Sequence, residues 1–531
     1  MSSPAAAARP GTVPPGTPAR TAPLLLRRVR LVPVAPRAGH TPAPAAPDAP
    51  VDLRIAGGVV TAVAPRLDPR PDEPVLDAAG RWAAPGLWDR HVHLGQWAGT
   101  FGRLDLSTAD SAAAVLDLVR ARLAGHPPGR PLLGFGFRDA LWPDAPTLGA
   151  LDAVAGATPV VLSSGDVHSG WLSSAARALL GLPAGAPGDD GLVREGPWFA
   201  ALARVPSLPG ADAAAGYRQA LAEAAARGVV GVVDVEFAAN EREWPERIGQ
   251  GLDLLRVRAG VYPDRLEAVL AAGLRTGDPL PGGAGLATMG PLKIISDGAL
   301  NTRTAHCRDA YPVPGDAGHP HGVQSVGPDE LARLLRRART GGLTVALHAI
   351  GDAAVGLALD AFAATGARGS IEHAQLLTAA DAARMARLGV VASVQPAHLL
   401  DDRDVAERVW AGRTGDAFPF RTLLDAGVPL AFGSDAPVAP LDPWLAMAAA
   451  VHRSADERAP WHPEQQLGVA EALAASTDGQ GTLGAGSRGD VVLLDADPLA
   501  PAATTAEAAA RLRAMPVAAT VLGGRVTHDA R

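Results

Sequence analysis

The chain has 531 residues, of which 47% are hydrophobic and 19% charged, so it is too apolar for a mostly disordered protein. A net charge of −7, with the arginines scattered along the sequence, argues against nucleic acid or an anionic membrane as a partner. The single cysteine, Cys307, excludes an intramolecular disulfide and a cysteine-rich zinc site.

The two ends of the chain differ from its middle. Residues 1–22 are rich in Ala and Pro, and we expect a disordered tail. Residues 23–83 and 480–531 carry short apolar strands punctuated by Gly57-Gly58 and Gly523-Gly524, where tight hairpins are expected. The pattern predicts one small β-sandwich domain built from both chain ends.

Residues 84–479 alternate short apolar strands with helical stretches rich in Ala, Leu and Arg, which indicates a parallel sheet with crossover helices. The length predicts an α/β fold of the (β/α)8 TIM-barrel type, with an insertion at about 96–215 that forms part of the substrate pocket. A doubly wound sheet is the alternative, but no Gly-rich phosphate loop follows the first strand. No apolar run has the length of a membrane span or the form of a signal peptide, so we expect a soluble, cytoplasmic protein.

Histidine and aspartate residues follow several predicted strands, at the ends where barrel enzymes place their chemistry. His91 and His93 are two residues apart in a strand, so both imidazoles can reach one metal ion. His348 and His373 each follow a short apolar segment, and Asp435 ends a strand, where it can ligate a metal and move a proton. Taken singly, each is equally explained as surface decoration, a buried structural histidine or a turn aspartate.

Only one of the 48 lysine and arginine residues is a lysine, Lys293. Because every other such side chain is an arginine, the single lysine indicates a position that needs an amine. Lys293 lies in an apolar strand, where desolvation favours the neutral amine, and a neutral amine can take up carbon dioxide to form an anionic carbamate. The alternatives are chance retention and a structural lysine paired with Asp297 or another carboxylate.

In the order His-x-His, Lys, His, His, Asp, these residues resemble the binuclear amidohydrolase superfamily over about residues 24–526. Four segments are similar to its YtcJ-like, amidohydrolase-3 branch, which includes deformylases of N-substituted formamides: residues 293–300, 303–305, 348–352 and 371–375. The resemblance implies that His91 and His93 bind one metal ion and that His348 and His373 bind the second. Carboxylated Lys293 would bridge the two.

The resemblance further implies a hydrolase that cleaves a non-peptide carbon–nitrogen bond of a small-molecule linear amide or N-substituted formamide. Hydroxide held between two divalent ions, usually zinc, would attack the carbonyl carbon, and Asp435 would ligate the first ion and return the proton to the leaving amine. A homodimer is also implied. The alternatives are a mononuclear deaminase of the same fold, which needs no carboxylated lysine, and a catalytically silent scaffold.

Two residues of the insertion are candidates for substrate binding. Trp142 lies in an aromatic, Gly-rich stretch that can line an apolar pocket, and His168 lies in a segment that resembles a His-Ser motif of the family. Ordinary packing explains either residue as well. The chain departs from the family at Arg90, where a small residue is usual, and at 478–481, where an Ala-rich helix is shortened.

Overall fold

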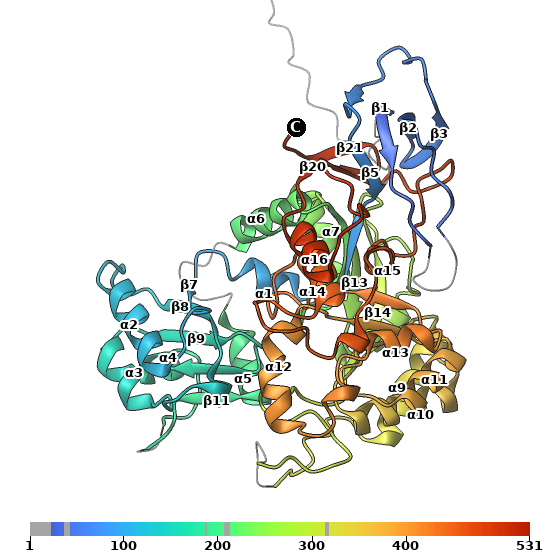
Figure 1. The fold of residues 1–531 in the computed structure, drawn as a ribbon. Coiled ribbons are helices and arrows are strands. Elements are labelled where there is room, and N and C mark those ends of the chain that lie inside the picture. The colour runs from blue at the N-terminus through green and yellow to red at the C-terminus, as the bar shows by residue number, and fades with distance from the viewer. Residues whose placement is uncertain (1–22, 37–42, 186–187, 206–212, 314–317) are drawn as a thin grey trace, which may run out of the picture.

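The computed structural model describes residues 23–36, 43–185, 188–205, 213–313 and 318–531 (Figure 1). The tail expected at 1–22 lies outside the described residues. The predicted fold class is confirmed, because an eight-stranded parallel barrel is combined with a sheet made from both chain ends. None of the helices in the described ranges combines the length and apolarity needed to cross a membrane.

Eight parallel strands form the barrel: β6 (Leu87–Val92), β12 (Val229–Asp234), β13 (Arg256–Val261), β14 (Ala287–Ile295), β15 (Val345–Ala349), β16 (Gly369–His373), β17 (Val391–Val394) and β18 (Leu430–Phe432). A bridge between Val92 and Ala436 brings the two ends of this order together. Strand β12, Val-Val-Gly-Val-Val-Asp, is buried along its whole length, as expected of a parallel strand covered on both faces.

Helices surround the barrel: α1 (Leu94–Ala98), α6 (Ala213–Ala226), α7 (Asn240–Gly249), α8 (Leu266–Ala271), α9 (Pro328–Gly341), α10 (Asp352–Thr365), α11 (Ala379–Leu388), α12 (His398–Val409), α13 (Phe420–Asp425), α14 (Pro443–His452), α15 (Val469–Ala475) and α16 (Thr505–Arg513). Helix α9 illustrates how the sequence sets their limits. It begins at a proline, which needs no hydrogen-bonded N–H there, and ends at Gly342 with φ 80°. Its leucines recur at helical spacing and face the barrel.

Strands from both chain ends share one sheet: β1 (Leu24–Leu31), β2 (Val51–Ala56), β3 (Val59–Ala64), β4 (Val75–Asp77), β5 (Trp82–Pro85), β19 (Val491–Leu494), β20 (Val517–Leu522) and β21 (Arg525–Asp529). An irregularity at Arg28, with φ 56°, shifts the register between β1 and β2; β1 also pairs with β4 before this residue and with β5 after it. Leu53 and Val521 belong to one apolar core, which joins the two ends of the chain.

The insertion forms its own five-stranded sheet beside the barrel, drawn in cyan to green in Figure 1. Its strands are β7 (Leu104–Asp105), β8 (Leu132–Phe137), β9 (Val160–Ser164), β10 (Ser169–Leu172) and β11 (Leu192–Arg194), and its helices are α2 (Ala112–Leu123), α3 (Leu148–Ala155), α4 (Ser174–Leu179) and α5 (Glu195–Leu202). Buried Phe137, Leu162 and Trp171 belong to a core separate from that of the barrel. The insertion is therefore a small α/β unit in its own right.

Candidate metal centre

A cavity of about 680 Å³ is lined by residues at the carboxyl ends of the barrel strands and by residues of the insertion. It brings together all six residues for which the sequence predicts a metal-binding role: His91, His93, Lys293, His348, His373 and Asp435. His168 also lines it, whereas Trp142 does not. Trp142 packs 5.7 Å from Phe137, ring to ring, because the insertion folds around its own apolar core.

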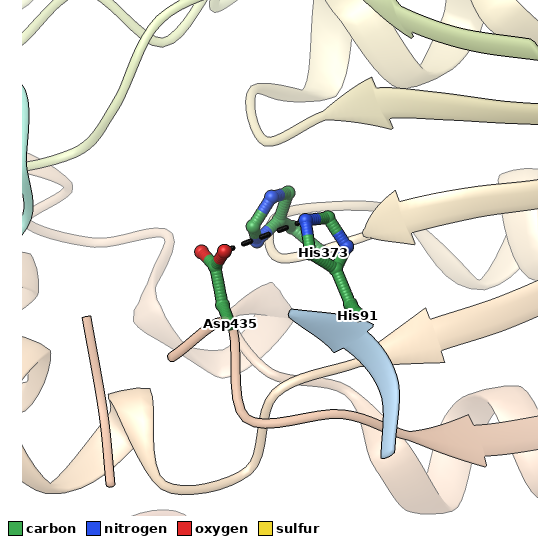
Figure 2. Close-up of side chains that lie close together, drawn as sticks. All are labelled: His91, His373 and Asp435. Atoms are coloured by element: carbon green, nitrogen blue, oxygen red, sulfur yellow. Dashed lines mark ion pairs between the residues drawn. The ribbon is translucent and has the colours of Figure 1, made fainter. Parts of the chain in front are cut away.

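Three buried side chains form the centre of the site (Figure 2). His91, His373 and Asp435 each offer a ligand atom, and these atoms lie within 4.8 Å of one another. His91 Nε2 is 3.4 Å and His93 Nε2 is 3.5 Å from Asp435 Oδ1. The two histidines predicted to share a metal ion therefore lie against the same carboxylate oxygen.

Unusual backbone angles aim two of these side chains. His373 has φ 69° and Asp435 has φ 58°, a left-handed conformation that is uncommon outside glycine and concentrated at functional sites. Neighbouring residues of a regular strand point to opposite faces. At this strand end, both Glu372 and His373 reach the centre: Glu372 Oε2 is 2.7 Å from His91 Nδ1, and the rings of His373 and His91 are 5.1 Å apart.

Lys293 lies on β14 and is 1% exposed. Its Nζ is 3.1 Å from His91 Nε2. Burial lowers the pKa of Lys293 to about 8, although Glu372 and Asp435 oppose the shift. The alternative pairing with Asp297 is not seen, since the Asp297 carboxylate instead accepts hydrogen bonds from the backbone N–H groups of His306, Ile350 and Gly351.

His348, on β15, lies beside the three central side chains. Its ring is 4.4 Å from that of His373, and its Nε2 is 3.1 Å from the carbonyl oxygen of Gly298 and 3.4 Å from Asp297 Oδ1. Burial, reinforced by nearby positive groups, holds the pKa of both His348 and His373 well below the usual histidine value. Both rings are therefore neutral at physiological pH, which is the form that ligates metals.

The residues present fit a metal centre. Buried polar atoms normally have hydrogen-bond partners, but Nδ1 of His93 and Nδ1 of His373 are buried and have none. Neutral imidazoles beside a carboxylate are a donor set suited to zinc and other first-row divalent ions. Glu372 fixes the orientation of His91 through the ring nitrogen that faces away from Lys293, the usual arrangement behind a metal-binding histidine.

The insertion reaches the cavity through a hydrogen-bonded histidine. His168 Nδ1 is 3.0 Å from Glu195 Oε2, and the other oxygen of Glu195 accepts hydrogen bonds from the hydroxyls of Thr302 and Thr304 on the barrel. Burial opposes the charge on His168, but Glu195 outweighs it and raises the pKa of His168 to about 9. His168 is therefore an imidazolium, in contrast to the neutral rings of His348 and His373 in the same cavity.

Other residues of the site were not identified from the sequence. Glu372 precedes His373 in the segment 371–375, but strand alternation predicts that its side chain points away from that of His373. His398 and Asp402 lie on helix α12, where no strand end signals them. His398 Nε2 is 3.9 Å from Asp435 Oδ2.

The two departures from the family pattern meet below the barrel. Asp478, in the shortened segment, accepts hydrogen bonds from Arg90, Arg258 and Arg488. Arg258 also stacks over Trp88 at 4.3 Å. Asp478, in the shortened segment, is thus a counter-ion of Arg90.

The sequence model of the amidohydrolase family matches residues 74–528. YtcJ of Bacillus subtilis (strain 168) is 27% identical over 506 residues, which cover 86% of this chain and 91% of YtcJ. An N-substituted formamide deformylase of Arthrobacter pascens is 27% identical over 84% of this chain and 90% of its own. An uncharacterised metal-dependent hydrolase of Pyrococcus horikoshii OT3 superposes with a TM-score of 0.72 at 25% identity, covering 90% of this chain and 99% of that one.

Proposed function

This chain belongs to the amidohydrolase family, and on that premise we propose that it is a metal-dependent hydrolase of a non-peptide carbon–nitrogen bond in a linear amide or N-substituted formamide. The observation that carries the proposal is the convergence of ligand atoms from His91, His373 and Asp435 within 4.8 Å, beside the buried amine of Lys293. The similarity to the Arthrobacter pascens deformylase supports the substrate class.

Two divalent ions, zinc by preference, would be held by the six residues named in the sequence analysis: His91, His93, Lys293, His348, His373 and Asp435. Such ions supply positive charge that polarises a carbonyl and makes water nucleophilic near neutral pH. The neutral rings and the small cavity described above suit this role. His91 is held in place by Glu372, so its Nε2 remains available as a ligand.

Lys293 would act as a carbamate. Its neutral amine attacks carbon dioxide, a nitrogen–carbon bond forms, and one proton leaves to solvent, which converts the amine into an anionic oxygen ligand. Burial favours the neutral amine that this reaction requires. Lys293 Nζ, 3.1 Å from His91 Nε2, lies among the residues that would hold the two ions.

Asp435 would transfer the proton, and His168 would stabilise the carbonyl oxygen of the substrate. Asp435 takes a proton from the water that attacks the carbonyl carbon and gives it to the nitrogen as the carbon–nitrogen bond breaks, releasing formate or another acid and an amine. His168, charged and fixed by Glu195, donates a hydrogen bond to the substrate oxygen as negative charge develops there.

The experiment combines activity with metal content. Purified protein is assayed on N-alkylformamides before and after chelation, and metal per chain is measured in the unmodified protein, in Lys293→Ala and in Lys293→Arg. We expect two ions per chain, chelator-sensitive release of formate, and loss of metal and activity in both variants. Reconstitution of the chelated protein should need bicarbonate as well as metal. One ion retained in Lys293→Ala, with ammonia as the product from an aminated substrate, would instead support a mononuclear deaminase.

A further inference from the structure

One wall of the cavity is formed by the beginning of helix α12. His398 and Asp402 are four residues apart, so they lie on the same face of the helix, and both line the cavity. Each is only 8% exposed. His398 Nε2 is 3.9 Å from Asp435 Oδ2, and Asp402 lies one helical turn, about 5.4 Å, farther along α12.

Asp402 is a buried carboxyl group without a cation. Its oxygens accept hydrogen bonds from the neutral amides of Gln375, at 3.0 Å, and Asn301, at 3.4 Å. Within the described part of the chain, no lysine, arginine or histidine forms an ion pair with it. Arg138 of the insertion acts on Asp402 only through space, because its guanidinium is engaged 2.7 Å from Asp401 Oδ2. A buried carboxylate that has only neutral partners is costly unless a positive group meets it.

His398, on the same wall, also offers a hydrogen-bond acceptor. The ring of His398 donates to the backbone carbonyl of Ser434, while its Nε2 is buried and has no hydrogen-bond partner. A neutral imidazole that donates through one nitrogen offers a lone pair on the other. His398 and Asp402 together therefore present acceptors to the cavity and no donor.

We propose that this wall is a subsite for a protonated amino group, so that the substrate is an N-formyl or N-acyl amine carrying a second, cationic nitrogen. The inference rests on the proposed function for the bond that is cut, and it adds the class of group at the far end of the substrate. An ammonium supplies three N–H donors and a positive charge, which match the acceptors and the uncompensated carboxylate of the wall.

Binding to the metal-loaded protein tests the subsite without any turnover. The probes are two non-hydrolysable sulfonamides of equal length, N-(4-aminobutyl)methanesulfonamide, which is a cation, and neutral N-pentylmethanesulfonamide. Calorimetry at pH 8.5 keeps Asp402 ionised, because burial raises the pKa of Asp402 to about 7. We expect the cation to bind roughly 10- to 100-fold more tightly, and Asp402→Asn to abolish the difference.

The control variant is Asp404→Asn, which removes the same charge from the same helix at an exposed ion pair with Arg458. It should leave the preference unchanged. Equal binding of the two probes, or a preference that survives Asp402→Asn, would overturn the subsite.

Kinetics separate this inference from the proposed function. The corresponding formamides, N-(4-aminobutyl)formamide and N-pentylformamide, are compared by kcat/KM, and Asp402→Asn should lower the value for the first and leave the second within about threefold. Hydrolysis of both at equal rates would uphold the proposed function and refute the subsite. Selective binding of the charged sulfonamide without hydrolysis of either formamide would uphold the subsite and refute the proposed function.

Discussion

Replacing Glu372 with glutamine should weaken metal binding while leaving the ligands in place. The carboxylate is 2% exposed and accepts hydrogen bonds from His91 Nδ1, at 2.7 Å, and from the hydroxyl of Ser370. Burial opposes its ionisation, but the contact with His91 prevails and lowers the pKa of Glu372. The contact is therefore charge-assisted and is worth about 1.5–3 kcal/mol. Its loss frees the ring of His91 to rotate, so metal affinity should fall by about 10- to 100-fold.

The assay is competition for zinc between the protein and a chromophoric chelator of known affinity, with hydrolysis measured in parallel at saturating metal. Glu267→Gln serves as the matched control, because Glu267 forms an exposed ion pair with Arg337 and does not line the cavity. Activity of Glu372→Gln should recover as metal is added. Unchanged zinc affinity, with a fold as stable as that of the unmodified protein, would refute the role given to Glu372.

Three further predictions concern the pocket, the region below the barrel and the insertion. If charged His168 stabilises the substrate oxygen, kcat/KM should fall as pH rises through about 9, and Glu195→Gln should move this fall to lower pH; a profile that does not move would exclude the role. Three arginines outweigh burial and lower the pKa of Asp478 to about 2, so its stabilisation is present above about pH 4 and is lost as pH falls towards 2. Asp478→Asn should therefore lower the free energy of unfolding in urea by about 3 kcal/mol at pH 7, with a smaller deficit at pH 3, and an equal deficit at both would contradict this. A Cβ at Gly170 would lie 2.2 Å from Trp198 Cζ3, so Gly170→Ala should destabilise the protein by about 1–3 kcal/mol, as followed by tryptophan fluorescence during unfolding; an unchanged transition would show that the ring moves aside freely.

The sequence predicts the barrel and the side chains that meet in its cavity, because the periodicity of the strands determines where each of these side chains lies. His91 and His93 obey the two-residue repeat of a strand, and Lys293 is marked by its rarity as well as by its apolar neighbours. Each such residue lies in or at the end of a predicted strand, and parallel strands of one barrel end at the same face. Proximity in space therefore followed from topology alone.

The remaining parts of the site depend on features that periodicity does not encode. Strand alternation predicts that Glu372 and His373 point to opposite faces, but the left-handed conformation of His373 lets both side chains reach the centre. His398 and Asp402 belong to a helix whose register against the cavity is set by packing. The sequence does not decide between a pocket and a core for Trp142, because an aromatic residue in a Gly-rich stretch suits both, and the outcome depends on whether the insertion has a core of its own.

The separate core of the insertion has a consequence for how such an enzyme can diversify. Because the ligand-bearing strand ends and this small α/β unit fold around different sets of apolar residues, mutations in one need not disturb the other. Swapping the unit between relatives would exchange Arg138, His168 and Glu195 as a block. Such a swap would change the cavity wall and leave the six side chains at the barrel strand ends untouched.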